Sequence, residues 1–123
     1  MAGESHRLRF GKSRRLQRSA DFTRVRTEGE SHRGSFLLVG VLAPADQPQS
    51  VSVGFVTSKR IGGAVTRNKV RRRLREIVRK HQHDLRSGIW LVVVARPRAA
   101  GATYSALEQE WLRLAKRASI LAP

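Results

Sequence analysis

The sequence predicts a single α+β domain, an α/β sandwich whose elements follow the order helix, strand, strand, helix, strand, helix (α-β-β-α-β-α). Its 123 residues suit one domain and provide enough chain for a hydrophobic core. Three short apolar segments have the length of strands, whereas other segments repeat their apolar residues at helical spacing. Because the second strand, the long helix and the third strand form a βαβ unit, part of the sheet should be parallel.

The first predicted helix is short. Ser19 is suited to its N-cap and Gly29 to its end, while Phe22 and Val25 supply its apolar side. The segment from Met1 to Arg18 is basic, and we expect it to be loop-like.

Two strands are predicted next. Ser35 to Leu42 is a nearly continuous apolar run, and Val51 to Val56 alternates between its two faces. A proline-containing loop separates these runs, so we expect them to pair with each other in antiparallel fashion. A fourth short strand is compatible with the sequence, which does not show where it lies.

The second half of the chain predicts two amphipathic helices around one strand. The first helix extends from about Thr66 to His83, and Ile89 to Ala95 is an apolar run typical of a strand buried on both faces. The last helix extends from Thr103 to Ser119. The inward faces of the two helices are, respectively, Val70, Leu74, Ile77, Val78 and His81, and Tyr104, Leu107, Trp111, Leu114 and Ala118.

The charge balance indicates a polyanionic partner. Lys and Arg number 25 against 9 Asp and Glu, so the net charge is 25 − 9 = +16. Nucleic acid is the leading candidate partner and an anionic membrane surface is the second. A continuous apolar stretch of about 18 residues, which a transmembrane helix needs, is absent from the sequence. The chain has no cysteine and no visible secretory signal, and we expect it in the reducing cytoplasm.

The long helix and the loop before it concentrate the positive charge. Asn68, Arg72 and Arg75 lie on one line of the helix, with Lys69 and Arg73 on the neighbouring line, opposite the apolar face. A solvated helix face normally mixes charges of both signs, whereas this one places like charges one turn apart, at a cost that a row of phosphates would offset. A membrane surface fits less well, because the core needs the apolar face.

The segment from Ser58 to Glu76 reads SKRIGGAVTRNKVRRRLRE. It closely resembles the signature of the bacterial ribonuclease P protein subunit, in which a Ser-Lys-Lys/Arg-x-Gly loop precedes an Ala-Val-x-Arg-Asn-Arg-x-Lys/Arg-Arg helix. The flanking segments agree with the same family, and the resemblance covers about residues 8 to 119.

The resemblance implies a fold like the second domain of a ribosomal small-subunit protein, with a left-handed βαβ crossover instead of the usual right-handed one. It further implies a subunit that joins a large catalytic RNA in an endonuclease that removes the 5′ leader of precursor tRNA. The RNA would carry out the chemistry with Mg²⁺ bound mainly by the RNA, and no obligate protein partner is inferred.

The resemblance also assigns residues to two binding surfaces. A cleft between the first helix and the sheet would hold the single-stranded leader. The residues expected to contact the leader are Phe22, Ser58, Lys59 and Arg60. The residues expected to dock on the catalytic RNA are Arg67, Asn68, Lys69, Arg71, Arg72, Arg73 and Arg75.

Three positions depart from the family pattern. The usual Arg-Asn-Arg is Arg67-Asn68-Lys69 here, which keeps the charge. Arg26 stands where many members carry a second aromatic residue on the first helix, and Val39 stands where some carry one on the first strand. We therefore expect fewer aromatic rings to stack on bases in the cleft than in those members, and contacts to phosphates to contribute relatively more.

Protein nucleases usually gather several carboxylates or histidines around metal ions. The nine acidic residues of this chain are scattered along it, so we assign no catalytic residue and no metal ligand to the protein. His81 lies on the apolar face, and we expect it to be structural. Glu76 is interpreted as the ion-pair partner of Arg72 or Lys80.

Some alternatives stay open at this level. Phe22 is suited to stacking on a base or to filling the core under the first helix. The small, polar strand face with Ser52 and Gly54 is suited to lie under a single strand or to face water. The competing function is a structural ribosomal or nucleoid protein, which is equally small and basic.

Overall fold

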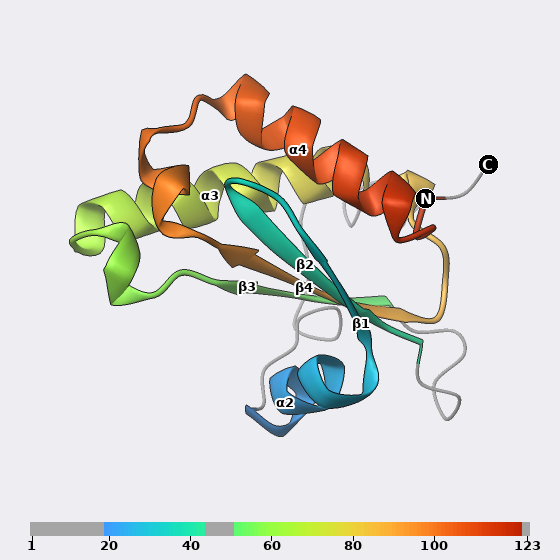
Figure 1. The fold of residues 1–123 in the computed structure, drawn as a ribbon. Coiled ribbons are helices and arrows are strands. Elements are labelled where there is room, and N and C mark those ends of the chain that lie inside the picture. The colour runs from blue at the N-terminus through green and yellow to red at the C-terminus, as the bar shows by residue number, and fades with distance from the viewer. Residues whose placement is uncertain (1–18, 44–50, 122–123) are drawn as a thin grey trace, which may run out of the picture.

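The computed structural model describes residues 19–43 and 51–121. The predicted loop-like segment from Met1 to Arg18 lies outside these residues. A sheet forms the middle layer, with helix α2 (Ser19–Glu28) on one face and helices α3 (Ala64–Lys80) and α4 (Tyr104–Arg117) on the other (Figure 1). The strands are β1 (Glu30–Arg33), β2 (Leu37–Leu42), β3 (Val51–Val56) and β4 (Ile89–Ala95). The predicted α+β class and element order are confirmed, with β1 added.

The strand order is β1-β2-β4-β3, so β4 lies inside the sheet. It pairs antiparallel with β2, where Val39 faces Val93, and parallel with β3, where Val53 faces Leu91. The predicted antiparallel pairing of residues 35–42 with residues 51–56 is therefore wrong. An almost wholly apolar strand is most stable in the interior of a sheet, and β4 takes that position between the other two strands. The predicted parallel βαβ unit is present as β3, α3 and β4.

Strand β1 is the fourth strand that the sequence did not place. Its residues Glu30 to Arg33 are mostly exposed and pair only with β2, at the sheet edge. It lacks the apolar alternation that reveals a strand in a sequence, because neither of its faces is covered as the inner strands are.

The two faces of β4 belong to different cores. Leu91 and Val93 lie in the larger core, under α3 and α4, whereas Trp90 and Val92 lie in a smaller cluster with Val25 of α2. The inward face predicted for α3 is confirmed for its four aliphatic residues, and that of α4 is centred on fully buried Leu107, Trp111 and Leu114. The sheet therefore separates the α3 and α4 side of the molecule from the α2 side.

Helix α3 begins at Ala64, two positions before the predicted start, and ends at Lys80 instead of His83. Gly63 is its N-cap, and a short 3₁₀ turn of residues 59–61 precedes it. Gly62 joins the turn to the helix at φ 148°, a backbone conformation that favours glycine. The Arg67-Asn68-Lys69 motif lies inside the helix, as it also would with the predicted start at Thr66.

The carboxylate of Glu110 ties α4 to the turn between β1 and β2. It is 2 % exposed and accepts backbone hydrogen bonds from Ser35 (3.0 Å), Phe36 (2.7 Å) and Leu37 (2.7 Å). A Cβ atom at Gly34 would collide with this carboxylate, so glycine lets the turn approach it. The β1–β2 hairpin is thereby fixed against the helical layer.

Replacing Glu110 should destabilise the fold far more than replacing its exposed neighbour Gln109. Glu110→Ala leaves three backbone N–H groups without their acceptor, so we expect the free energy of unfolding to fall by about 3 kcal/mol or more. Gln109→Ala on the same helix should change it by less than about 0.5 kcal/mol. Denaturant titrations of the two variants check this, and equal losses would contradict the assigned role.

Candidate nucleic-acid interface

The outer face of α3 is a cationic surface. Asn68, Lys69, Arg72 and Arg75 are exposed, and the buried residues of the helix lie on the opposite side. No acidic residue occurs in the first turn of the helix, while basic residues continue to its end. This face presents N–H donors and positive charge along several helical turns, which is the arrangement that contacts a row of phosphates.

Two of the predicted RNA-docking arginines also hold the protein together. Arg71 donates a hydrogen bond from Nη2 to the Thr57 Oγ1 at 2.5 Å, and Arg73 donates from Nη1 to the Ala102 carbonyl at 3.0 Å. Both are half-buried, as is Arg67. Asn68, Lys69, Arg72 and Arg75 are therefore the more accessible part of the predicted set.

The loop before α3 holds three of the predicted leader-binding residues. Ser58 caps the 3₁₀ turn, because its Oγ accepts from the Arg60 backbone N–H at 3.3 Å. The side chains of Lys59 and Arg60 are exposed beside it. The loop directly follows β3, whose last residue, Val56, lines the pocket described next.

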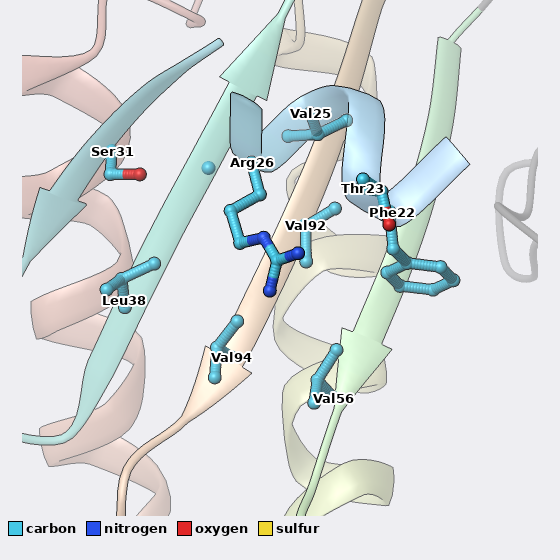
Figure 2. A pocket seen from close by; sticks show the side chains of 10 residues that line it. Phe22, Thr23, Val25, Arg26, Ser31, Leu38, Val56, Val92 and Val94 are labelled. Carbon is cyan, nitrogen blue, oxygen red and sulfur yellow. The ribbon is translucent and has the colours of Figure 1, made fainter. Parts of the chain in front are cut away.

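A pocket of about 380 Å³ lies between α2 and the sheet, on the face away from α3 and α4 (Figure 2). Phe22, the fourth predicted leader-binding residue, is half-buried at this pocket and packs against the small core cluster. It is therefore neither fully in the core nor free in solvent. The pocket is lined by Phe22, Thr23, Val25, Arg26, Ser31, Leu38, Gly40, Val56, Val92 and Val94.

The pocket differs from the predicted cleft at specific positions. Val39 is fully buried in the larger core, on the opposite face, so its lack of an aromatic ring has no bearing on this pocket. Leu38 and Gly40 line it in its place. Ser52 and Gly54 are buried and do not line the pocket. Their strand face therefore neither lies under a single RNA strand nor faces water, the two alternatives that the sequence left open.

Sequence reasoning placed only Phe22 and Arg26 at this cleft and missed the other eight lining residues, among them Thr23, Ser31 and Leu38. Ser31 belongs to β1, which the sequence did not reveal. Leu38 lies in a continuous apolar run, where no alternation tells which side chains share a face. Thr23 follows directly after Phe22 on α2, and this adjacency was the one signal available for it.

Glu108 of α4 binds the end of α3. Its carboxylate lies 3.0 Å from the Lys80 ammonium and 2.8 Å from the His81 Nε2. Hydrogen bonds from His81 and then Lys80 lower the pKa of Glu108, and the same contact raises the pKa of Lys80. Glu76 was expected to pair with Lys80 or Arg72. Within residues 19–43 and 51–121, Lys80 pairs with Glu108 and no ion pair joins Glu76 to either residue.

His81 is a structural residue, as predicted. Its ring stacks on Trp111 with centroids 5.7 Å apart, in addition to its contact with Glu108. In the described part of the chain, no three His, Cys, Asp or Glu side chains gather so as to hold a metal ion. No helix among the described residues is long and apolar enough to cross a membrane.

Comparison with known proteins identifies the family of this fold. The family model for ribonuclease P matches residues 10–119. The chain belongs to the bacterial ribonuclease P protein family. Its relatives include the ribonuclease P protein component of Halalkalibacterium halodurans, 35 % identical and aligned over 91 % of this chain and 93 % of that protein. That of Beutenbergia cavernae is 42 % identical over 78 % of this chain and 80 % of that protein.

Solved structures of ribonuclease P proteins share the fold. The protein from Staphylococcus aureus superposes with a TM-score of 0.81, is 26 % identical, and covers 89 % of this chain and 99 % of its own. The protein from Thermotoga maritima, solved with 1-(4-fluorophenyl)-2-thiourea, has a TM-score of 0.73, 25 % identity and coverage of 83 % and 97 %. The family inferred from residues 58–76 is thereby confirmed, and with it membership in a tRNA-processing enzyme.

Proposed function

We propose that this chain binds the catalytic RNA of ribonuclease P through the outer face of α3 and the single-stranded 5′ leader of precursor tRNA through the α2 pocket. The observation that carries the proposal is the separation of two different surfaces by one sheet. Helix α3 lies on one side of the sheet and α2 on the other (Figure 1). The exposed cations belong to α3, and the pocket lies under α2. One subunit therefore has room to contact two RNA molecules at once.

The α3 surface suits a folded RNA. Cations spread along a helix neutralise closely spaced phosphates and release counterions, which makes binding strong and salt-dependent. Asn68, Lys69, Arg72 and Arg75 are exposed for this contact, and Arg67, Arg71 and Arg73 border them. Cations one turn apart on α3 repel each other and destabilise the free protein. A bound polyanion would relieve that repulsion.

The pocket suits an unpaired strand. Its floor of valines accepts the flat face of a base, and the half-buried Phe22 ring offers a surface for stacking. Ser58, Lys59 and Arg60 come shortly after β3, which ends at Val56 beside the pocket. They are therefore suited to contact the phosphates of an RNA strand bound in the pocket.

The chemistry is assigned to the RNA subunit. Several acidic side chains in the described residues already have protein partners: Glu110 binds the β1–β2 turn, Glu108 binds α3, and Glu28 lies 3.4 Å from Arg24. Within residues 19–43 and 51–121, no three His, Cys, Asp or Glu side chains gather so as to hold a metal ion. We propose that the Mg²⁺ of the reaction is bound mainly by the RNA. We expect this assembly to work in the cytoplasm without an obligate further protein.

Reconstitution tests the proposed function. Purified protein freed of RNA should not cleave precursor tRNA in Mg²⁺, whereas protein combined with a bacterial ribonuclease P RNA should release the 5′ leader. The protein should also lower the Mg²⁺ concentration that the RNA requires, because its cations replace counterions. Specific cleavage by the RNA-free protein would contradict the proposal. Recovery of ribosomal RNA or bulk DNA with the chain would favour the ribosomal or nucleoid alternative.

Variants of α3 should separate RNA binding from folding. Arg72→Ala or Arg75→Ala should weaken binding to the catalytic RNA and reduce its salt slope by about one unit per lost contact. Arg73→Ala should also lower the free energy of unfolding by about 1 kcal/mol, because its bond to Ala102 is lost. Arg117→Ala, exposed at the end of α4, serves as the control and should change neither quantity. Salt titrations that show equal slopes for all four variants would contradict the α3 surface.

Phe22→Ala should weaken binding of precursor tRNA to the reconstituted enzyme by about 1–3 kcal/mol and leave mature tRNA binding unchanged, because a stacked leader base is lost. Phe36, half-buried on the opposite sheet face, provides the matched control. Phe36→Ala should lower the melting temperature without a preference between the two tRNA forms. If Phe22→Ala behaves in the same way as Phe36→Ala, Phe22 belongs to the core alone.

A further inference from the structure

A single lining residue of the pocket carries a charge. Arg26 extends from α2 over the pocket floor, and its guanidinium lies beside Val92, toward Val94 (Figure 2). Within residues 19–43 and 51–121, no hydrogen-bond acceptor or carboxylate partner of this guanidinium is found, and the side chain is exposed. An Arg group with unoccupied donors over an apolar floor is available to a ligand.

The neighbouring arginine of the same helix has a different environment. Arg24 stacks over Trp90, with its guanidinium carbon 5.3 Å from the ring centroid, and its Nε lies 3.4 Å from Glu28. Arg26 instead lies one helical turn after Phe22, on the same side of α2. The Phe22 ring and the Arg26 guanidinium stand on either side of Val92 in the pocket (Figure 2).

The apolar floor favours a base over a phosphate at this position. Burying a phosphate against Val56, Val92 and Val94 would strip its water without supplying enough donors, whereas the face of a base is itself apolar. The edge of that base would then meet Arg26, which has donors only. The other polar lining residues, Thr23 and Ser31, carry hydroxyls that donate or accept, so they do not discriminate between bases.

Guanine is the base that matches this donor pattern. Its O6 and N7 are neighbouring acceptors that a guanidinium binds with two parallel hydrogen bonds. Adenine keeps N7 but carries an amino donor in place of O6, so one of the two bonds is replaced by a contact between donors.

We propose that Arg26 is a specificity-determining residue that makes the pocket select an unpaired guanine of the leader. The Phe22 ring and the valine floor hold the base, and Arg26 donates to O6 and N7. The proposal rests on the leader binding proposed above, and it gives that site a base preference. At this position, where many family members carry an aromatic ring that can stack, this chain therefore has an arginine that can donate hydrogen bonds.

The test uses the enzyme reconstituted with ribonuclease P RNA and precursor tRNAs with an otherwise all-uracil leader. Guanine, adenine or 7-deazaguanine is placed at each leader position in turn, and dissociation constants are measured. At one position guanine should bind about five- to hundredfold more tightly than adenine, the range expected for one bidentate contact. The 7-deazaguanine leader, which lacks the N7 acceptor, should lose most of that advantage.

Protein variants then assign the preference to Arg26. Arg26→Lys keeps the charge but loses the two parallel N–H donors of the guanidinium, so it should reduce the preference for guanine. Arg26→Gln should shift it toward adenine, because a Gln amide pairs with N6 and N7 of that base. Arg24→Gln makes the same charge change on the same helix outside the pocket and should leave the preference unchanged.

The outcomes separate this inference from the proposed function. If precursor tRNA binds more tightly than mature tRNA but no leader position prefers guanine, the guanine proposal is overturned while leader binding stands. A preference that persists in both Arg26 variants also overturns it. Equal binding of precursor and mature tRNA would overturn leader binding and the guanine proposal together.

Discussion

The contact between the Glu110 carboxylate and the turn at residues 34–37 sets the position of the β1–β2 hairpin. A buried carboxylate needs strong donors, and three backbone N–H groups of this turn supply them. Arg96 reinforces the turn, because its Nη1 donates to the Gly34 carbonyl at 2.7 Å. Since Ser31 of β1 and Leu38 of β2 line the pocket, a contact made on the α4 side of the sheet positions one wall of the site on the other side.

Strand β4 lets one small domain carry two surfaces. Its alternate residues belong to different cores, with Leu91 and Val93 under the α3 and α4 layer and Trp90 and Val92 under α2. The larger core buries the apolar face of α3 and leaves its cations in solvent. The smaller core covers only part of the opposite face, and the remainder of that face forms the pocket floor. A larger α2 core would have closed this space.

The basic residues of α3 divide into those that contact other parts of the protein and those that are exposed to solvent. Arg71, Arg73 and Lys80 contact other parts of the chain, whereas Arg72 and Arg75 are exposed on the same helix. A chain with a net charge of +16 repels itself, so contacts that fix α3 to Thr57, Ala102 and Glu108 counter this repulsion. The exposed Arg72 and Arg75 have no such contact in the described residues and add to the repulsion between like charges in the free protein.

The sequence by itself determined the elements whose signal is local. The helical spacing of Val70 and Leu74 showed the buried face of α3, the unbroken apolar run of β4 showed an interior strand, and the basic motif at residues 58–76 showed the family. Tertiary structure decided which strands are neighbours, which face Val39 occupies, and that Lys80 pairs with Glu108. These features depend on segments far apart in the chain, and periodicity along one segment carries no information about which other segment covers it.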